Sequence, residues 1–187
     1  NQYDGKVPYE DMFFEELIPY MEKTYRIRSD KESRAIAGLS MGGYGSFLYS
    51  LHHPDMFCAC APLSAAVFDD TVMEARKARS HKDLFNRLFG PGDEHWKQNN
   101  VLKILSDWDQ NDLPKIRYYI DCGDDDGLLD GNMQVHQIMR QKGIRHEFRV
   151  RDGGHSWTYW RTALPEVLRF CLLYTSPSPR ATERSRM

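Results

Sequence analysis

The sequence lacks several features that would point to particular classes of function. It has no apolar run long enough to cross a bilayer, and its 25 Lys and Arg residues nearly balance 27 Asp and Glu. The resulting net charge of −2 gives no electrostatic reason to expect a nucleic-acid or membrane partner. With 41% hydrophobic and 28% charged residues among 187, the composition predicts one globular domain with a sizeable core.

Metal-ligand patterns are also missing from the sequence. The cysteines are Cys58, Cys60, Cys122 and Cys171, and their spacing is not that of a zinc site. The sequence contains no His-Glu-x-x-His pattern either. We therefore expect neither a metal nor a cofactor, and the cysteines leave the redox compartment open.

One short stretch carries the strongest chemical signal. Ser40 lies in a Gly-x-Ser-x-Gly pattern between a strand-like apolar run and a helix-like segment, which is typical of a nucleophile elbow. Gly38 and Gly42 are expected to leave room for a strained turn at Ser40. An ordinary serine in a tight turn is the alternative. A phosphate-binding loop is less favoured, because Tyr44 stands where that loop requires a lysine.

Strand-like and helix-like segments alternate along the chain, which predicts an α/β fold with a mainly parallel sheet. The apolar runs 35–39 and 57–63 show no polar alternation, which is typical of strands covered on both faces. For 35–39 we expect this inside the sheet of a longer parent protein, with one edge of the strand open in this chain. Pro19 predicts a kink or an early end in the first helix. The expected helices are 9–25, 44–53, 131–142 and 157–170, and the expected strands are 34–39, 57–63, 116–121 and 146–150.

Residues 68–113 interrupt this alternation and form a charged excursion with helix-like pieces at 82–89 and 95–105. Such an excursion is either a cap over the catalytic end of the sheet or a peripheral decoration. We expect one domain at 1–170, followed by a tail at 171–187 that resembles translated adapter sequence and is non-native and disordered. A genuine Ser/Pro-rich tail is the alternative. Asn1 is not a natural start, so we also expect an N-terminal part to be missing.

A nucleophilic serine needs a base and an orienting acid, in the elbow order Ser, Asp or Glu, His. His155 follows two glycines between the last expected strand and the last expected helix, which suits a base brought over the sheet edge. The other histidines are expected to be surface or packing residues. The loop after the third strand is rich in aspartate, and spacing alone leaves Asp124, Asp125 and Asp126 open as the acid.

Three motifs taken together resemble one family. Gly38–Gly43, the Gly123-x-x-Asp126 loop and Gly154-His155-x-Trp157 resemble the esterase D-like branch of the α/β-hydrolases, from about Tyr9 to Phe170. That branch includes feruloyl and acetyl-xylan esterases, S-formylglutathione hydrolases and mycolyltransferases. The resemblance implies an α/β-hydrolase sandwich whose N-terminal strands are absent here.

The resemblance also implies a role for each site residue. Ser40 would be the nucleophile, His155 the general base and then acid, and Asp126 the acid that orients His155. The Met41 amide would be one oxyanion donor, and Trp157 would contact substrate. The family's second oxyanion loop precedes the elbow, and only 39 residues precede Ser40 here, so we expect this loop to be missing and the chain alone to be inactive or feeble.

The expected function is that of a serine esterase acting through an acyl-enzyme on small or polysaccharide-linked esters, acetyl or feruloyl. Acyl transfer on the same fold and a non-catalytic binding module are the alternatives. Trp157, Tyr159 and Trp160 follow His155 and could stack on substrate or pack the last helix on the sheet, and packing is favoured for at least one. A polysaccharide esterase would be secreted or periplasmic, and an S-formylglutathione hydrolase cytoplasmic. The sequence leaves the oligomeric state open.

Overall fold

The sheet consists of parallel strands that follow one another in space as they do in the chain. The computed structural model describes residues 1–78, 82–90, 92–109 and 115–175, and in these ranges the strand order is β1-β2-β3-β4. The strands are β1 (Ala35–Leu39), β2 (Ala59–Leu63), β3 (Arg117–Gly123) and β4 (His146–Arg151). The predicted α/β fold with a mainly parallel sheet is confirmed.

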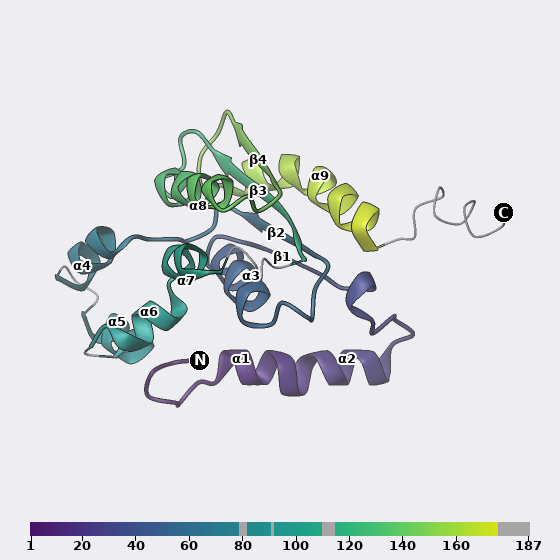
Figure 1. Ribbon diagram of the computed structural model, residues 1–187, viewed down its shortest axis with the longest axis horizontal. Coiled ribbons are helices and arrows are strands. Elements are labelled where there is room, and N and C mark those ends of the chain that lie inside the picture. The colour runs from purple at the N-terminus through teal and green to yellow at the C-terminus, as the bar shows by residue number, and fades with distance from the viewer. Residues whose placement is uncertain (79–81, 91, 110–114, 176–187) are drawn as a thin grey trace.

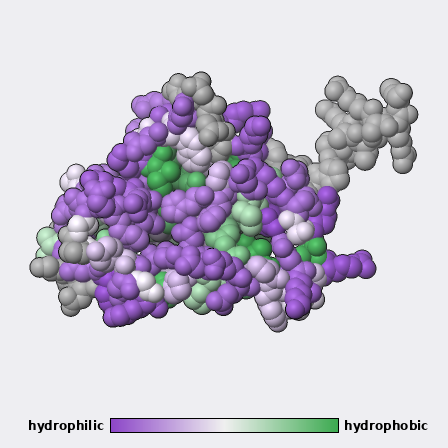
Figure 2. Space-filling model, turned by 60° about the horizontal axis from the view of Figure 1, so that its bottom comes forward, coloured by the Kyte–Doolittle hydropathy of each residue, from purple (hydrophilic) through white to green (hydrophobic). Residues whose placement is uncertain are grey.

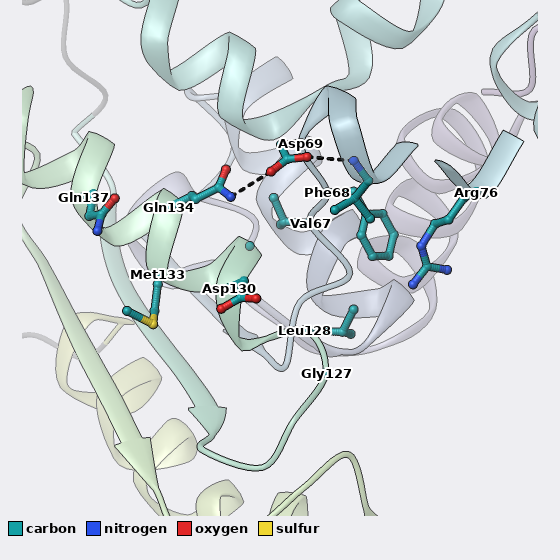
Figure 3. A pocket seen from close by; sticks show the side chains of 12 residues that line it. Val67, Phe68, Asp69, Arg76, Gly127, Leu128, Asp130, Met133, Gln134 and Gln137 are labelled. Atoms are coloured by element: carbon teal, nitrogen blue, oxygen red, sulfur yellow. Dashed lines mark hydrogen bonds between the residues drawn. The ribbon is translucent and has the colours of Figure 1, made fainter. Parts of the chain in front are cut away.

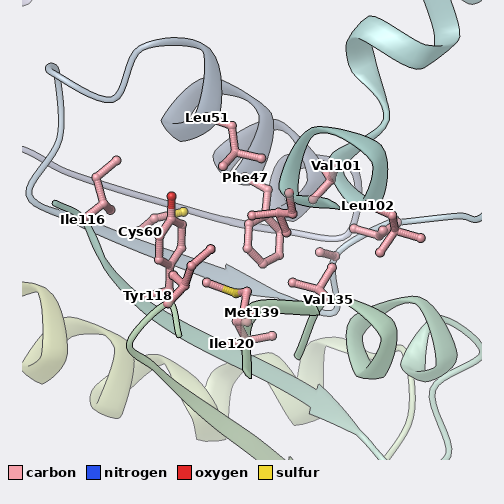
Figure 4. Close-up of a cluster of buried hydrophobic side chains, with 14 of the residues drawn as sticks. Phe47, Leu51, Cys60, Val101, Leu102, Ile116, Tyr118, Ile120, Val135 and Met139 are labelled. Carbon is pink, nitrogen blue, oxygen red and sulfur yellow. The ribbon is translucent and has the colours of Figure 1, made fainter. Parts of the chain in front are cut away.

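Helices cover both faces of the sheet and make a three-layer arrangement (Figure 1). One face carries α3 (Met41–His52), α7 (Val101–Asp107) and α8 (Leu129–Gln141), and the other carries α9 (Trp157–Thr175). The larger core lies on the α3 side, where Phe47 of α3 and Met139 of α8 close over Tyr118 and Ile120 of β3 (Figure 4). Each such side chain contributes about 1.5–3 kcal/mol by leaving water, which fixes the helices on the strands.

The two strands with continuous apolar runs differ in their burial. All residues of β2 are buried, as expected for a strand with neighbours on both sides. In β1 only Ile36 is buried and Ala37 is exposed, which agrees with the expectation that one edge of this strand is open in this chain. The reason is position, because β1 is the edge strand and no described strand pairs with its outer side.

The first helix accommodates a proline without ending. It runs through α1 (Tyr9–Asp11), a π-helical segment η1 (Met12–Leu17) and α2 (Ile18–Thr24). Pro19 has no N–H, and in an ideal α-helix its ring would collide with the carbonyl four residues earlier. The wider π turn comes directly before Pro19, and there the Ile18 amide donates to the Phe13 carbonyl. The expected early end is therefore wrong, and the helix continues to Thr24.

The outer side of this helix is exposed to solvent. Tyr9, Met12, Leu17 and Tyr20 are each about half exposed and line a shallow hollow. Figure 2 shows the face that carries this helix, where apolar surface interrupts a mainly hydrophilic one. Among the helices of the described ranges, none combines the length and apolarity needed to cross a membrane.

The 68–113 excursion contains more helix than the sequence suggested. The piece expected at 82–89 is α5 (Lys82–Phe89), but α4 (Asp70–Ala78) was not anticipated. The piece expected at 95–105 is divided into α6 (Glu94–Asn99) and α7 by Asn100, whose side chain accepts from the Leu102 and Lys103 amides and caps α7. The helices α4 to α6 form a small cluster around Met73 and Trp96, whereas α7 belongs to the main core.

The last helix passes the expected domain boundary. The α9 helix includes Pro165 without interruption and ends at Thr175, five residues beyond Phe170. The remainder of the expected tail, 176–187, lies outside the described residues, as do 110–114 at the end of the excursion. A short 3-10 turn, η2 (Lys31–Ser33), leads into β1 and completes the described elements.

Two histidines at the C-terminal end of α3, its last residue His52 and the next residue His53, bind the first helix through one carboxylate. Glu10 Oε1 lies 2.9 Å from His52 Nδ1 and 2.8 Å from His53 Nε2. Burial alone would raise the pKa of Glu10, but the hydrogen bonds from both histidines lower it to about 2. The same hydrogen bond raises the pKa of His52 above its usual 6.5, against the effect of burial.

We expect the first helix to loosen as the pH rises. Because the folded pKa of His52 is raised, its stabilisation is fully present below pH 6.5 and is lost as the pH rises through the raised value. Glu10 remains ionised throughout this window. Amide exchange of residues 9–24, corrected for intrinsic rates, should be faster at pH 8 than at pH 6. His52→Gln should reduce the difference, because only the His53 contact to Glu10 then remains. Equal protection of the unmodified chain at both pH values would contradict the assignment.

Candidate active site

Ser40 stands at the turn between β1 and α3 in a strained backbone conformation. Its φ of 58° and ψ of −117° are unfavourable for a residue with a side chain. Three backbone hydrogen bonds hold it there: its amide donates to the Leu63 carbonyl, and its carbonyl accepts from the Tyr44 and Ala66 amides. The turn is therefore fixed by the neighbouring strand as well as by its own helix.

Two glycines make this turn possible, and one of them was not anticipated. A Cβ on Gly38 would lie 2.2 Å from the Gly42 carbonyl oxygen, so the need for glycine at Gly38 is confirmed. A Cβ on Gly42 would meet nothing within 4 Å, so the need expected there is wrong. The crowded helical position is Gly43, where a Cβ would lie 2.8 Å from the Leu63 carbonyl oxygen.

The two motif glycines should therefore respond differently to alanine. Gly38→Ala should destabilise the fold by about 1–3 kcal/mol, because either the elbow or the start of α3 must move. Gly42→Ala should be neutral or stabilise by up to about 1 kcal/mol, because it adds a good helix former in open space. Chemical denaturation of both variants checks this pair. Equal losses would mean that the turn requires both glycines for another reason.

His155 lies between Ser40 and a buried carboxylate. Its Nε2 is 2.9 Å from Ser40 Oγ, and its Nδ1 is 2.9 Å from Oδ2 and 3.2 Å from Oδ1 of Asp126. A carboxylate can only accept, so Nδ1 carries the proton and Nε2 is left to accept from the serine hydroxyl. The Asp126 side chain is fully buried, whereas the His155 side chain is partly exposed.

Backbone hydrogen bonds join the two loops that carry this pair. The Asp124 amide donates to the Arg151 carbonyl, and the Asp125 amide donates to the Gly153 carbonyl. The Asp124 carboxylate accepts from the Gly153 amide, while Asp125 is exposed and makes no hydrogen bond to His155 in the described part of the chain. Of the three aspartates that spacing left open, only Asp126 reaches the imidazole. The carboxylates of Asp124, Asp125 and Asp152 form an exposed acidic group beside the loops.

The other two expected site residues lie at the ends of helices. Met41 is the first residue of α3, and its side chain is 79% exposed. Its amide has no helical carbonyl one turn earlier, so it is available beside Ser40. Trp157 is the first residue of α9 and is 62% exposed, whereas Tyr159 and Trp160 are buried. Packing therefore accounts for two of the three aromatic residues.

Sequence reasoning did not anticipate the support beneath His155. The ring of Trp160 lies perpendicular to the imidazole at a centroid distance of 4.7 Å, and its indole N–H donates to Ser64 Oγ at 3.0 Å. Ser64 follows β2, is fully buried and has a positive φ of 44°. A tryptophan five residues after the histidine is a signal that could have been used. The strained serine left no signal in the sequence.

A pocket of about 340 Å³ borders the acid loop (Figure 3). One wall comes from the start of the excursion, where the Arg76 guanidinium lies 4.1 Å above the Phe68 ring. The other wall is α8 with the turn before it, and Asp69 joins the walls by accepting from Gln134 at 2.9 Å. Leu128 lines the pocket, and its amide donates to Asp126 Oδ1. The lining of the pocket is both apolar and polar and includes Gly127 and Leu128, but not Asp126, His155 or Ser40.

Comparison with known proteins identifies the family of this chain. The model of the Esterase family, described as "Putative esterase", matches residues 1–171. The chain belongs to this family. Its relatives include an acetyl esterase of Caldicellulosiruptor saccharolyticus, 29% identical over 154 residues that make up 78% of this chain and 56% of the relative. The resemblance noted from the three motifs is thereby confirmed.

Two further relatives of this esterase-family chain are feruloyl esterases by name. An endo-1,4-beta-xylanase/feruloyl esterase of Xylanibacter ruminicola is 40% identical over 161 residues, which cover 85% of this chain and 17% of that protein. A solved ferulic acid esterase is 38% identical, with a TM-score of 0.77, over 90% of this chain and 62% of the other. The chain thus spans little more than half of the acetyl esterase and less than two thirds of the solved one.

Proposed function

We propose that this chain carries the catalytic centre of a serine carboxylic-ester hydrolase. In this proposal Ser40 is the nucleophile, His155 is the base and then the acid, and Asp126 orients the imidazole. The observation that carries the proposal is the continuous line from Ser40 Oγ to His155 Nε2, and from Nδ1 to Asp126, with 2.9 Å at each step. Membership of the Esterase family supports the same reaction class.

The reaction follows from the positions of the protons. Ser40 Oγ attacks the ester carbonyl carbon while its proton passes to His155 Nε2. The buried Asp126 carboxylate stabilises the imidazolium that forms. Nε2 then protonates the departing alcohol oxygen, which leaves an acyl group on Ser40. A water molecule then attacks the acyl carbon while the same nitrogen takes its proton. When the bond from the acyl carbon to Ser40 Oγ breaks, that proton passes to Ser40 Oγ and the acid is released.

We assign the Met41 amide to the negative charge that develops on the carbonyl oxygen. It lies at the positive end of the α3 dipole, directly after the nucleophile. One donor of this kind accounts for about 10²–10³ in rate. The strained φ of Ser40 supports this role, because the turn that raises the hydroxyl also leaves the next amide at the open end of the helix.

For the substrate we propose an acetyl or feruloyl ester linked to a polysaccharide. The names of the similar acetyl and feruloyl esterases support this class. The exposed Trp157 ring offers a face for a sugar or an aromatic acyl group. Turnover of acetylated and feruloylated xylo-oligosaccharides would separate the two acyl groups.

A labelling experiment tests the proposed function without a known substrate. A fluorophosphonate forms a covalent bond with a serine only where a base activates that serine. We expect it to label the chain at Ser40, as located by peptide mass spectrometry, and we expect no label in Ser40→Ala. A Ser106→Ala variant, with its serine on α7 bonded to the Leu102 carbonyl, should label like the unmodified chain. An intact chain that stays unlabelled would refute the proposal.

A further inference from the structure

An ionic cluster around the buried Asp121 carboxylate lies next to the loop that carries His155. Asp121 of β3 is completely buried, and its carboxylate accepts from the Tyr159 hydroxyl at 2.5 Å and the Tyr119 hydroxyl at 2.8 Å. The Arg151 guanidinium lies 2.9 Å from the same carboxylate and also bonds to Glu166 at 2.7 Å. Every one of these partners comes from β3, β4 or α9, so the cluster ties three elements together.

The Asp121 carboxylate binds the chain both before and after the loop that carries His155. Arg151 is the last residue of β4, four positions before His155, and Tyr159 lies in the first turn of α9, four positions after it. The loop of residues 152–156 is thus closed at each end by a side chain bound to the Asp121 carboxylate. A shift of either end of the loop would therefore move the His155 imidazole.

The loop also rests directly on the Tyr159 ring. Gly153 has a φ of 134°, and a Cβ there would lie 2.8 Å from a ring carbon of Tyr159. A Cβ on Gly123 would lie 1.9 Å from the Gly153 carbonyl oxygen, so β3 presses on the loop from the other side. The hydrogen bond from its hydroxyl to Asp121 fixes the position of the Tyr159 ring. The ring in turn fixes the backbone of Gly153, two residues before His155.

An ion pair between a buried carboxylate and a partly exposed guanidinium adds little net stability, because desolvation of the carboxylate offsets most of the attraction. Its hydrogen bonds are directional, however, so they define a geometry more sharply than apolar packing does. Burial and the Asp121 carboxylate both raise the pKa of Tyr159, which therefore remains a hydrogen-bond donor over the whole working range of pH.

We propose that Tyr159 is a positioning residue that sets the distance from His155 to Ser40 through its hydrogen bond to Asp121. This inference rests on the proposed esterase function for its consequence in turnover. Its structural part concerns only the His155 imidazole. Tyr159 itself is buried and acts through Asp121 and the 152–156 loop.

The chain supplies a matched control in Tyr119. Tyr119→Phe and Tyr159→Phe each remove one phenolic hydroxyl from the same carboxylate and keep the ring. The Tyr119 hydroxyl also accepts from Arg151 at 2.7 Å, a contact that Tyr119→Phe removes as well, but of the two rings it is that of Tyr159 that lies against Gly153 of the His155 loop. We expect Tyr159→Phe to lower kcat about 10- to 100-fold with KM nearly unchanged, since small misplacements of catalytic groups have effects of this size. Tyr119→Phe should stay within about threefold of the unmodified chain, an expectation set by the same geometric argument.

Nuclear magnetic resonance of His155 provides a readout that does not depend on turnover. The Nδ1 proton held against Asp126 should give a sharp downfield signal in the unmodified chain and in Tyr119→Phe. The signal should broaden or vanish in Tyr159→Phe at a temperature where thermal unfolding shows all three chains to be folded. If Tyr159→Phe does not fold, Arg151→Gln loosens the other end of the loop and should cause the same loss.

The outcomes separate the inference from the proposed function. An identical His155 signal in all variants, or equal losses of kcat in the two phenylalanine variants, would overturn the positioning role. Absence of Ser40-dependent labelling in the unmodified chain would instead refute the esterase proposal and leave the resonance comparison valid. Loss of the signal confined to Tyr159→Phe, or to Arg151→Gln where Tyr159→Phe is unfolded, supports the inference.

Discussion

Replacing Ser40 with alanine should lower kcat for p-nitrophenyl acetate to the background rate. In a complete triad enzyme this loss is about 10⁶-fold, and it is smaller here by the same factor by which the unmodified chain is itself feeble. The variant keeps the fold but loses the only oxygen that His155 Nε2 contacts among the described side chains. Alanine also fits the strained turn no worse than serine does, because both side chains carry a Cβ. A steady-state assay together with thermal unfolding measures both effects.

His155→Ala should cause a loss of the same order, and the double variant should be little worse than either single one. The reason is that the two side chains act as one unit: without the base the hydroxyl is not deprotonated, and without the hydroxyl the base has no proton to take. Losses that multiply in the double variant would show that the two residues act independently. Full turnover in Ser40→Ala would refute the nucleophile assignment.

The sequence predicted those parts of the fold and site that depend on local pattern. The strands, the helix after the elbow and the order Ser40, Asp126, His155 all follow from apolar runs and from loops that begin where strands end. Because the strands are parallel, such loops meet at one edge of the sheet, which explains how residues 86 and 29 positions apart come together. The choice among three neighbouring aspartates came from family resemblance, since spacing alone did not distinguish them.

Features that depend on contacts between distant elements could not be predicted. The crowding at Gly43 comes from the Leu63 carbonyl of the next strand. The residues of the elbow alone give no information about the position of that strand. The Asp121 cluster needs side chains from β3, β4 and α9 to meet in the interior. Helix α4 was missed because its sequence is mostly polar, and only Met73 of that helix is buried.

Asp126→Asn should lower kcat by about 10⁴-fold while leaving the fold and substrate affinity nearly intact. The asparagine amide can donate to His155 Nδ1, which places the imidazole proton on Nε2 instead. Nε2 then points an N–H at Ser40 Oγ and has no lone pair with which to accept the serine proton. The loss therefore arises from the wrong tautomer, and a steady-state assay in which kcat falls and KM stays constant would reveal it.

Asp124→Asn is the matched control, because it makes the same chemical change two residues away in the same loop. Asp124 accepts the Gly153 amide through Oδ1, and an asparagine oxygen can still accept that bond. We expect kcat within about threefold of the unmodified chain, as is usual for a hydrogen bond that the substitution preserves. Asp125→Asn, at an exposed position, should have as little effect. If Asp124→Asn or Asp125→Asn matched the loss at Asp126, the negative charge of the whole loop, and not one oriented carboxylate, would be what His155 requires.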